Sequence, residues 1–407
     1  MQAEFDLLII GGGMVGASLA RAMTGQGLRI GVVEAFPVEA DGQPSFDDRV
    51  IALSWGSRLI LQGIGVWDEM AGAAEPIVRI HVSDRGHFGF THLDHADEGV
   101  DALGYVATAR AMGEVLQKGL DKLSGVEFIC PANLQAFTLN DKAVDVTLDV
   151  AGQTRRVSTK LLVAADGGDS LVRRLLSIPL REREYGQTAI IANLVPGRPH
   201  GGIAYERFTD SGPLAMLPMT GDRVSMVWTA RHDQVDALMA LSDQAFLQAL
   251  QARFGYRLGR LQSIGKRSAY PLRLRQVSEQ VRKRVALIGN AAHAIHPVGG
   301  QGFNLGLRDV AALADVLSDA AATHQDPGEL TLLQRYADWR RRDQQVVATL
   351  TDTLARLFAN PLGPLRLTRN VGLLGLDGVP ALKHLLAKQF MGINGRLPRL
   401  GRGVSLD

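Results

Sequence analysis

Three glycines and one glutamate near the start of the chain have the types and spacing that hold a nucleotide. Gly11, Gly13 and Gly16 form a G-x-G-x-x-G motif directly after a short apolar run, and Glu34 closes a second apolar run. Glycines let the backbone approach a pyrophosphate, and an acid about 20 residues further on accepts hydrogen bonds from ribose hydroxyls. The order of these features predicts a dinucleotide site. The alternative is a glycine turn that only joins a strand to a helix.

A second strand end carries a carboxylate of the same kind. The buried apolar run 161–165 stops at Asp166, which is followed by two glycines and a basic helix. A carboxylate at the C-terminal end of a strand can bind hydroxyls or the edge of a nucleotide. The alternative is a turn with a helix N-cap at Asp169 or Ser170.

The stretch 286–309 joins a buried strand, a loop rich in proline and glycine, and a helix start. Pro297 and Gly302 belong to the loop, and Phe303 begins a helix that we expect to continue to Leu317. A helix N-terminus favours negative charge. A flat ring that becomes anionic during its working cycle, such as a reduced flavin, suits this position.

The elements that must position these residues indicate an α/β fold. Short, nearly all-apolar runs such as 5–10 are typical of parallel strands that are covered on both faces, and a helix follows at 17–24. Runs that alternate apolar and polar residues, at 77–106 and 186–230, indicate antiparallel strands of a second domain. We therefore predict a Rossmann-type domain with an interleaved antiparallel-sheet substrate domain and a C-terminal helical region.

Domain boundaries follow from these changes of pattern. We predict the nucleotide-binding domain to be discontinuous and the last region to be helical, basic and apolar. The expected ranges are 1–76, 105–180 and 281–340 for the first domain, 77–104 and 181–280 for the substrate domain, and 341–407 for the C-terminal region.

Two arginines lie at the starts of predicted helices. Arg49 lies where a helix is expected to begin, at about residue 48, and to continue to about Leu61. Arg110 lies in the first turn of a helix expected at 109–123. For Arg49 the alternative to a ligand contact is an ordinary solvated side chain.

Composition excludes several classes of protein. The 407 residues include 44 Lys+Arg against 42 Asp+Glu, so no global field favours nucleic acid. Cys130 is the only cysteine, which excludes a disulfide framework and cysteine-ligated zinc, and no metal site is expected at His293 and His296. No secretion signal and no run of about 18 apolar residues is visible, so we expect a cytoplasmic protein, soluble or peripheral to the membrane.

The segment after Asn360 combines basic and apolar residues. Residues 361–407 contain seven Lys and Arg against two Asp, a local net charge of +5. A basic, apolar segment can lie on an anionic membrane surface. The alternative is a helical lid with a solvated basic face.

Three of these signals occur together in one family. The chain has G-x-G-x-x-G with Glu34, then Asp166 before glycine, then Gly289-Asn290 ahead of His296-Pro297. Over nearly its whole length it resembles the single-component FAD-dependent aromatic hydroxylases of the para-hydroxybenzoate hydroxylase type. Within that group it resembles the hydroxylases of ubiquinone biosynthesis. The motifs that carry the narrower resemblance are Ser83-Asp-Arg-Gly-His87, Glu206-Arg-Phe-Thr209, Gly212-Pro-Leu-Ala-Met-Leu-Pro218, Gly265-Lys-Arg-Ser-Ala-Tyr-Pro271 and Gly300-Gln-Gly-Phe-Asn-Leu-Gly306.

The resemblance implies that the matching positions line one FAD site. Pro297 would lie beside the flavin ring, and backbone N–H groups around Phe303 would meet its pyrimidine edge. Asn290 departs from the family, which usually has Asp there; the amide keeps an acceptor oxygen but loses the charge. The implied cofactor-binding residues are Gly11, Gly13, Gly16, Glu34, Arg49, Arg110, Asp166, Gly289, Asn290, Pro297, Gly302, Phe303 and Asn304.

The resemblance also implies the reaction. NADPH or NADH would reduce FAD, O2 would add at the flavin C4a, and the hydroperoxide would hydroxylate the ring of a lipophilic polyprenylated (methoxy)phenol. A multiprotein complex of ubiquinone biosynthesis and contact with the inner face of the cytoplasmic membrane are implied partners. Only one G-x-G-x-x-G is present, and a lone cysteine counts against the flavoprotein disulfide reductases.

No residue type or spacing identifies a proton-transfer group. His87, Tyr185, Tyr205 and Tyr270 could contact or deprotonate a phenol, although buried His and Tyr are more often structural. Three other functions stay open. They are hydroxylation of another ring position in the same pathway, reduction of isoprenoid double bonds by an FAD-dependent prenyl reductase, and a non-enzymatic FAD-bearing scaffold.

Overall fold

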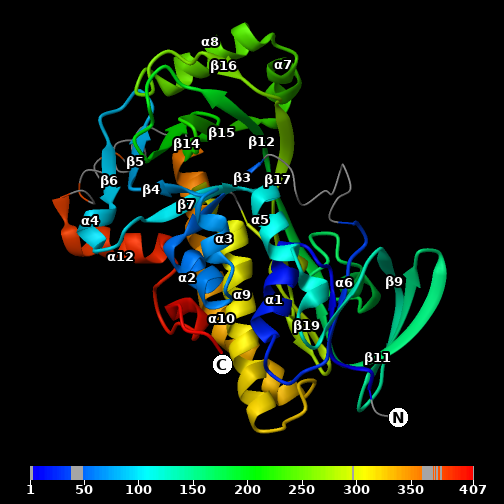
Figure 1. Ribbon diagram of the computed structural model, residues 1–407. Coiled ribbons are helices and arrows are strands. Elements are labelled where there is room, and N and C mark those ends of the chain that lie inside the picture. Colours follow the sequence, from blue (N-terminus) through cyan, green and yellow to red (C-terminus); the bar gives the residue numbers. More distant parts are fainter. Residues whose placement is uncertain are drawn as a thin grey trace.

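A computed structural model describes residues 3–37, 49–295, 298–359 and 378–406, together with Asn370, Gly372 and Gly375 (Figure 1). The predicted contact of Pro297 with a flavin falls outside these residues, and so do Arg366, Arg369 and most of the segment that links them to residue 378.

The first sheet is parallel at its centre. Its strands run in the order β18, β19, β11, β1, β2, β8, with β10 paired to β11 and β9 to β10. Leu7 of β1 is in register with Leu161 on one side and Ile30 on the other. All six residues of β1 are buried, as the apolar run predicted. The bounds are β1 Phe5–Ile10, β2 Ile30–Val33, β8 Val126–Ile129, β9 Ala132–Leu139, β10 Val144–Val150, β11 Gln153–Ala164, β18 Val281–Arg282 and β19 Val285–Leu287.

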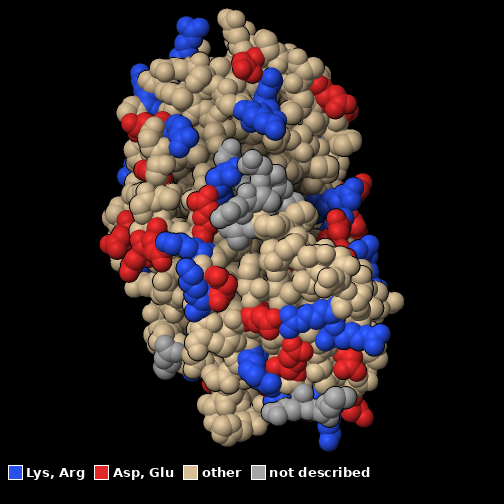
Figure 2. All heavy atoms as spheres, turned by 45° about the vertical axis from the view of Figure 1, so that its right-hand side comes forward, with Lys and Arg blue, Asp and Glu red and all other residues tan. Residues whose placement is uncertain are grey.

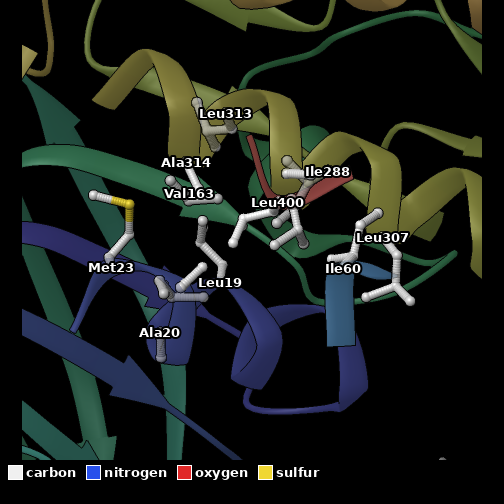
Figure 3. Close-up of a cluster of buried hydrophobic side chains, with 14 of the residues drawn as sticks. Leu19, Ala20, Met23, Ile60, Val163, Ile288, Leu307, Leu313, Ala314 and Leu400 are labelled. Carbon is white, nitrogen blue, oxygen red and sulfur yellow. The ribbon is translucent and has the colours of Figure 1, made fainter. Parts of the chain in front are cut away.

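Helices cover one face of this sheet and form the largest core. Leu19 and Met23 of α1 reach toward Val163 of β11 and toward Leu313 and Ala314 of α9 (Figure 3). The helices around this core are α1 Met14–Met23, α2 Trp55–Gly63, α3 Trp67–Ala71, α5 Ala109–Gln117, α9 Gln301–Ala322 and α10 Leu330–Ala359, and α6 Leu171–Leu175 packs on the other face.

The second sheet is mainly antiparallel. Its strands run in the order β20, β17, β12, β15, β14, β13, β5, β6, with β16 paired to β12. Trp228 of β15 packs against Phe246, which places α8 on one face of the sheet. The bounds are β5 Arg79–Asp84, β6 Phe90–Asp94, β12 Leu180–Val195, β13 Ile203–Thr209, β14 Gly212–Met219, β15 Arg223–Arg231, β16 Ser263–Ile264, β17 Ser268–Val277, β20 His293–Ala294, α7 Val235–Met239 and α8 Asp243–Phe254.

A small third sheet and two further helices complete the architecture. The third sheet has the order β3 Val50–Ser54, β7 Gly104–Thr108, β4 Glu75–Ile77. In Figure 1, α12 Pro380–Phe390 lies beside α4 His95–Glu98. The predicted α/β fold class, with a second sheet between segments of the first and helices near the C-terminus, is confirmed.

Two local predictions were wrong. The helix expected from residue 48 begins only at Trp55, because Val50–Ser54 pairs as a strand with β7 and the Ser54 hydroxyl caps the helix by accepting from the Ser57 N–H. The antiparallel strand expected at the start of the 77–106 segment is two strands, β4 and β5. β5 pairs antiparallel with β6, as expected, but in parallel with β13.

The described surface shows mixed charge and no membrane-spanning helix. On the face shown in Figure 2, Lys and Arg side chains are interspersed with Asp and Glu. Among the described helices, none combines the length and the hydropathy needed to cross a bilayer.

Replacing Leu313 with alanine should lower the free energy of unfolding by about 2–5 kcal/mol, because a fully buried leucine leaves a cavity when it is truncated. Urea denaturation measures the change. Val346→Ala in α10 is the matched control, since Val346 is 42% exposed and its loss should change stability by less than about 0.5 kcal/mol. Equal effects of the two substitutions would contradict this account of the core.

Candidate functional site at the carboxyl edge of the parallel sheet

The strand-end residues predicted from the sequence meet at one edge of the first sheet. Gly11, Glu34, Asp166 and Gly289 follow the C-terminal ends of β1, β2, β11 and the β19 segment, and these strands are neighbours and parallel. Open parallel sheets bind ligands at this edge. The topology therefore brings residues far apart in the chain to one edge, with Asp166 at the end of β11 between Gly11 after β1 and Gly289 after β19.

The glycine loop after β1 has no room for side chains. A Cβ on Gly16 would lie 1.9 Å from the carbonyl oxygen of Gly11, and one on Gly11 would lie 2.5 Å from that of Ala165. Gly11 also has a φ of +102°. The sequence did not single out Gln117, whose amide nitrogen donates to the Gly12 carbonyl at 2.5 Å and holds the loop from α5.

Glu34 is fixed against the same loop. Its carboxylate accepts hydrogen bonds from the N–H groups of Gly12 at 2.8 Å and Phe36 at 3.0 Å. Burial raises the pKa of Glu34 despite these donors. A carboxylate with two oxygens has acceptor capacity beyond two donors, so Glu34 can still accept hydroxyl groups of a ligand.

One carboxylate oxygen of Asp166 accepts hydrogen bonds from the protein, and the other accepts none from the described residues. Its Oδ2 accepts from the N–H groups of Leu171 at 2.8 Å and Val172 at 3.2 Å, and Ser170 caps the same short helix. Its Oδ1 is buried and has no hydrogen-bond partner among the described residues. Burial raises the pKa of Asp166. The alternative of a helix N-cap is confirmed at Ser170, and Oδ2 of Asp166 also accepts from this helix start, while Oδ1 is left for a ligand donor.

Asp309 of α9 anchors the loop after β19 through hydrogen bonds. This carboxylate is fully buried and accepts from the Gly289 N–H at 3.1 Å, His293 Nε2 at 2.6 Å and Arg340 Nε at 2.8 Å. Gln344 donates to it at 2.9 Å. Burial alone would raise the pKa of Asp309, but His293 and Arg340 hold it well below its usual range. Asp309 ended the stretch singled out in the sequence, yet no spacing marked it as the anchor.

Asn290 and the N-terminus of α9 lie on the open side of this anchor. Asn290 is exposed, whereas Gly289 is buried. Gly299 and Gly300 both have left-handed backbones, with φ of +67° and +64°, and a Cβ on Gly302 would meet no atom within 4 Å. The first N–H groups of a helix lack intrahelical partners, so this end of α9 presents donors beside open space.

The side chain of Asn304 has a structural role. Its oxygen accepts from the Ser54 N–H at 2.9 Å and the Ser57 hydroxyl at 2.7 Å, and its nitrogen donates to the carbonyls of Ala52 and Gly300, each at 2.8 Å. With every polar atom bound, only the backbone of Asn304 remains for a ligand.

The two predicted arginines lie close together. The Ala109 N–H donates to the Arg49 carbonyl at 2.8 Å, which places Arg49 beside the first turn of α5 and therefore beside Arg110. The Arg49 guanidinium also lies 4.8 Å from the centre of the Tyr270 ring, a cation–π contact. The β3–β7 ladder therefore brings the backbones of Arg49 and Arg110 close together.

An apolar cavity of about 160 Å³ lies between the start of α9, the second sheet and α12. Gly299, Gln301 and Asn304 form its α9 wall, and Leu386 and Phe390 belong to its α12 wall. The other lining residues are Ala52, Leu53, Ser54, Ile77, Ile80, Val82, Thr91, Leu93, Leu103, Gly104, Glu206, Phe208, Leu354, Ala387 and Met391.

The four candidate proton-transfer residues do not line this cavity. His87 is exposed in the turn between β5 and β6. Tyr185 lies beside Asp352, and burial followed by that carboxylate raises its pKa. Tyr205 packs edge-on against Phe254 on the α8 side of the sheet, and Tyr270 is engaged by Arg49. The four side chains are scattered rather than convergent.

Comparison with known proteins places the chain in a family. Residues 4–351 match the family model described as FAD binding domain. The chain is 39% identical over 404 residues to ubiquinone hydroxylase UbiL of Rhodospirillum rubrum, covering 98% of this chain and 93% of that protein. It is 32% identical to 3-demethoxyubiquinol 3-hydroxylase of Escherichia coli, covering 95% and 98% of the two chains.

Solved structures show the same fold. The crystal structure of p-nitrophenol 4-monooxygenase PnpA from Pseudomonas putida superposes with a TM-score of 0.81, at 19% identity, over 97% of this chain and 100% of that chain. P. aeruginosa PqsL in complex with 2-aminobenzoylacetate superposes with a TM-score of 0.77, at 23% identity, over 91% and 99%. At these identities the likeness establishes the fold alone.

Asp309→Asn should lower the free energy of unfolding by about 3–5 kcal/mol, because it removes the charge that compensates buried Arg340. Urea denaturation at neutral pH measures the loss. The folded pKa is depressed, so the stabilisation by Asp309 is complete above the unfolded pKa of about 3.9 and declines as the pH falls below it. The deficit of the variant should therefore shrink in acid.

Asp338→Asn is the matched control for this experiment. Asp338 pairs with Arg341 on the exposed side of α10, at 2.8 Å, and surface pairs contribute less than about 1 kcal/mol. If Asp309→Asn is no more destabilising than this control, the carboxylate does not anchor the loop.

Proposed function

Because the chain belongs to the FAD binding domain family and is an FAD-dependent aromatic monooxygenase of the ubiquinone hydroxylase group, we propose that it hydroxylates the ring of a polyprenylated phenol or methoxyphenol. The apolar cavity beside the start of α9 carries the proposal. An apolar cavity of about 150 Å³ holds one benzene ring, and this one measures about 160 Å³.

The described residues fit FAD at the sheet edge. Gly11 and Gly16 leave room only for a close backbone approach, and the uncommitted Oδ1 of Asp166 supplies an acceptor for a ligand hydroxyl. In this assignment Glu34 would accept hydrogen bonds from the ribose hydroxyls, and Asn290 would hold the ribityl chain. FAD, when bound and reduced by NADPH or NADH, supplies the activation of O2 for transfer of one oxygen atom to the ring.

The protein holds the reacting groups together and keeps water away from them. The N–H groups at the start of α9 favour a ligand that carries negative charge. The wall opposite them is apolar and includes Val82, Leu93 and Phe208, so a ring held there is largely removed from water. Gln301 donates to the Phe390 carbonyl at 3.2 Å, which fixes α12 against this end of α9.

A prenyl chain needs a longer apolar path than the ring, and α12 offers one. Leu386 and Phe390 face the cavity, while Val379, Leu382 and Leu385 are 49%, 51% and 54% exposed. We infer that the outer face of α12 rests on an anionic lipid surface, from which the substrate reaches the cavity. This contact would explain why α12 is apolar both toward the cavity and toward solvent. We therefore propose a peripheral location at the cytoplasmic membrane.

The reaction is tested with purified protein that carries FAD. Oxidation of NADPH should accelerate when a polyprenylated 2-methoxyphenol is added, and mass spectrometry should find a product heavier by one oxygen atom, since one atom of O2 enters the ring. An FAD-loaded protein that hydroxylates no phenolic quinone precursor would overturn the proposal. A product with a saturated isoprenoid bond and no O2 uptake would identify a prenyl reductase, and the absence of NADPH turnover would identify a scaffold. The precursor that accumulates in a deletion strain identifies the ring position.

Replacing both Leu382 and Leu385 with glutamate should weaken binding to phosphatidylglycerol vesicles by about 10–100-fold, because two apolar anchors of roughly 1–2 kcal/mol each are lost. Vesicle flotation measures the binding, and vesicles of neutral phosphatidylcholine measure the electrostatic part. Leu330→Glu, at a leucine that is 43% exposed at the start of α10, is the control. Unchanged flotation of the double variant would remove α12 as the contact.

A further inference from the structure

Glu206 is the one ionisable side chain among the described residues that line the apolar cavity. It lies on β13, in register with Val82 of β5 and Ala215 of β14. Successive residues of a strand face opposite sides, so Tyr205 packs on the α8 side, against Phe254, while Glu206 lines the cavity. A carboxyl group on the wall of an apolar cavity is costly unless it is hydrogen-bonded, so its presence there must be explained.

The carboxyl group of Glu206 has no hydrogen-bond or ion-pair partner in the described part of the chain, and burial is the only cause that raises its pKa, to about 7. By contrast, the protein supplies donors to Asp309 and Asp166. Asp309 has four donors, and Asp166 has two on one oxygen. An unpaired charge in an apolar site is costly, so near pH 7 both forms of Glu206 are populated, and a ligand that supplies a donor stabilises the carboxylate.

Arg207 of β13 and Lys388 of α12 do not line the cavity, and seven charged groups on the surrounding elements are engaged elsewhere. Each has its own partner in the structure and none lines the cavity. They are Asp84 of β5 with Asn370, His92 of β6 with His81, Asp94 with Arg79, Arg308 of α9 with Asp343, Asp352 of α10 with Arg183, Lys383 of α12 with Asp97, and His384 with Glu98. The cavity therefore offers Glu206 a single kind of partner, which is the polar group of a bound ligand.

We propose that Glu206 is a catalytic residue that binds the phenolic O–H of the substrate and takes its proton. This rests on the proposed function, because it needs a phenol in the cavity. The carboxylate accepts the phenolic proton, and the electron pair stays on the phenol oxygen, which makes the ring a stronger nucleophile toward the oxygen donor. After oxygen transfer, the attacked carbon loses its hydrogen as a proton to water. The phenol oxygen recovers a proton from Glu206, which restores the carboxylate.

A role as proton acceptor explains why the pKa of Glu206 is raised and why its carboxyl group has no hydrogen-bond donor from the protein. General bases work best when their pKa lies near the operating pH, and they contribute about 10²–10⁴-fold to the rate. A carboxylate with protein donors, such as Asp309, is too weak a base for a phenol. A carboxylate without protein donors is a stronger base, so the proton affinity of Glu206 lies closer to that of the phenolate.

The closing experiment compares Glu206→Gln with Glu329→Gln, an exposed glutamate at the end of the α9–α10 connection. The probe is a geranyl-substituted 2-methoxyphenol, and its O-methyl ether, which has no phenolic proton, is the ligand control. Hydroxylated product should fall by about 100-fold or more in Glu206→Gln, and the rise of kcat with pH around 7 should disappear. Absorption of the bound phenolate should be visible with the wild type and absent with Glu206→Gln, while FAD content stays the same.

A second measurement does not depend on turnover. A carboxyl with a raised folded pKa binds its proton more tightly in the native state, so native stability falls as the pH rises from about 4.3 toward 7. This decline should be lost in Glu206→Gln and kept in Glu329→Gln. This comparison of stability against pH shows whether the substituted protein is folded and whether the Glu206 carboxyl lacks a protein partner.

The outcomes separate the two proposals. If the wild type hydroxylates no phenol, the proposed function fails. If the wild type hydroxylates the probe and Glu206→Gln does so at the same rate with the same pH profile, the role of Glu206 is overturned while the function stands. Loss of product with an unchanged pH profile and unchanged phenolate absorption would reduce Glu206 to a structural residue and would also overturn the proposal.

Discussion

The buried carboxylate of Asp309 is the constraint on which the arrangement of the site depends. It accepts from the Gly289 backbone, His293, Arg340 and Gln344, so it joins the loop after β19 to α9 and α10. His293 lies on β20, which pairs with β17 of the second sheet. One carboxylate therefore links the sheet that carries the nucleotide edge to the sheet that carries the cavity. Breaking such a pair costs about 3–5 kcal/mol, which is enough to hold these segments in one geometry.

The cavity inherits its position from that anchor through two further contacts. Asn304 on α9 binds both sides of the β3–α2 junction, through Ala52 and Ser54 of β3 and Ser57 of α2, so the start of α9 is fixed about one turn before Asp309. Gln301 then binds the Phe390 carbonyl of α12. A chain of buried polar contacts thus runs from the parallel sheet to the outermost helix. We infer that a ring in the cavity and a flavin at the start of α9 would be positioned by the same set of bonds.

The sequence predicts those features whose cause is local. The apolar run of β1 has the bounds expected, and the strand-end residues Glu34 and Asp166 lie at the edge where parallel topology requires. Features that depend on pairing with distant segments of the chain were not predicted. The segment Val50–Ser54 is a strand because β7 pairs with it, and nothing within it excludes a helix. Glu206 was visible only as part of a motif, since its isolation depends on walls contributed by segments from residue 52 to residue 391.

The carboxylates of Asp309, Asp166 and Glu206 differ in how many of their oxygens the protein's own donors occupy. Asp309 is bound by protein donors at both oxygens, and its pKa is depressed. Asp166 is bound at one oxygen, and Glu206 at neither, and the pKa of each is raised by burial. Hydrogen-bond donors stabilise the charged form, and every donor that the protein provides occupies a lone pair that a ligand could use. The supply of donors at each carboxylate therefore fixes its basicity and its availability together. The tyrosines that residue type suggested for proton transfer, Tyr185, Tyr205 and Tyr270, do not line the cavity, and each has a neighbour elsewhere in the fold.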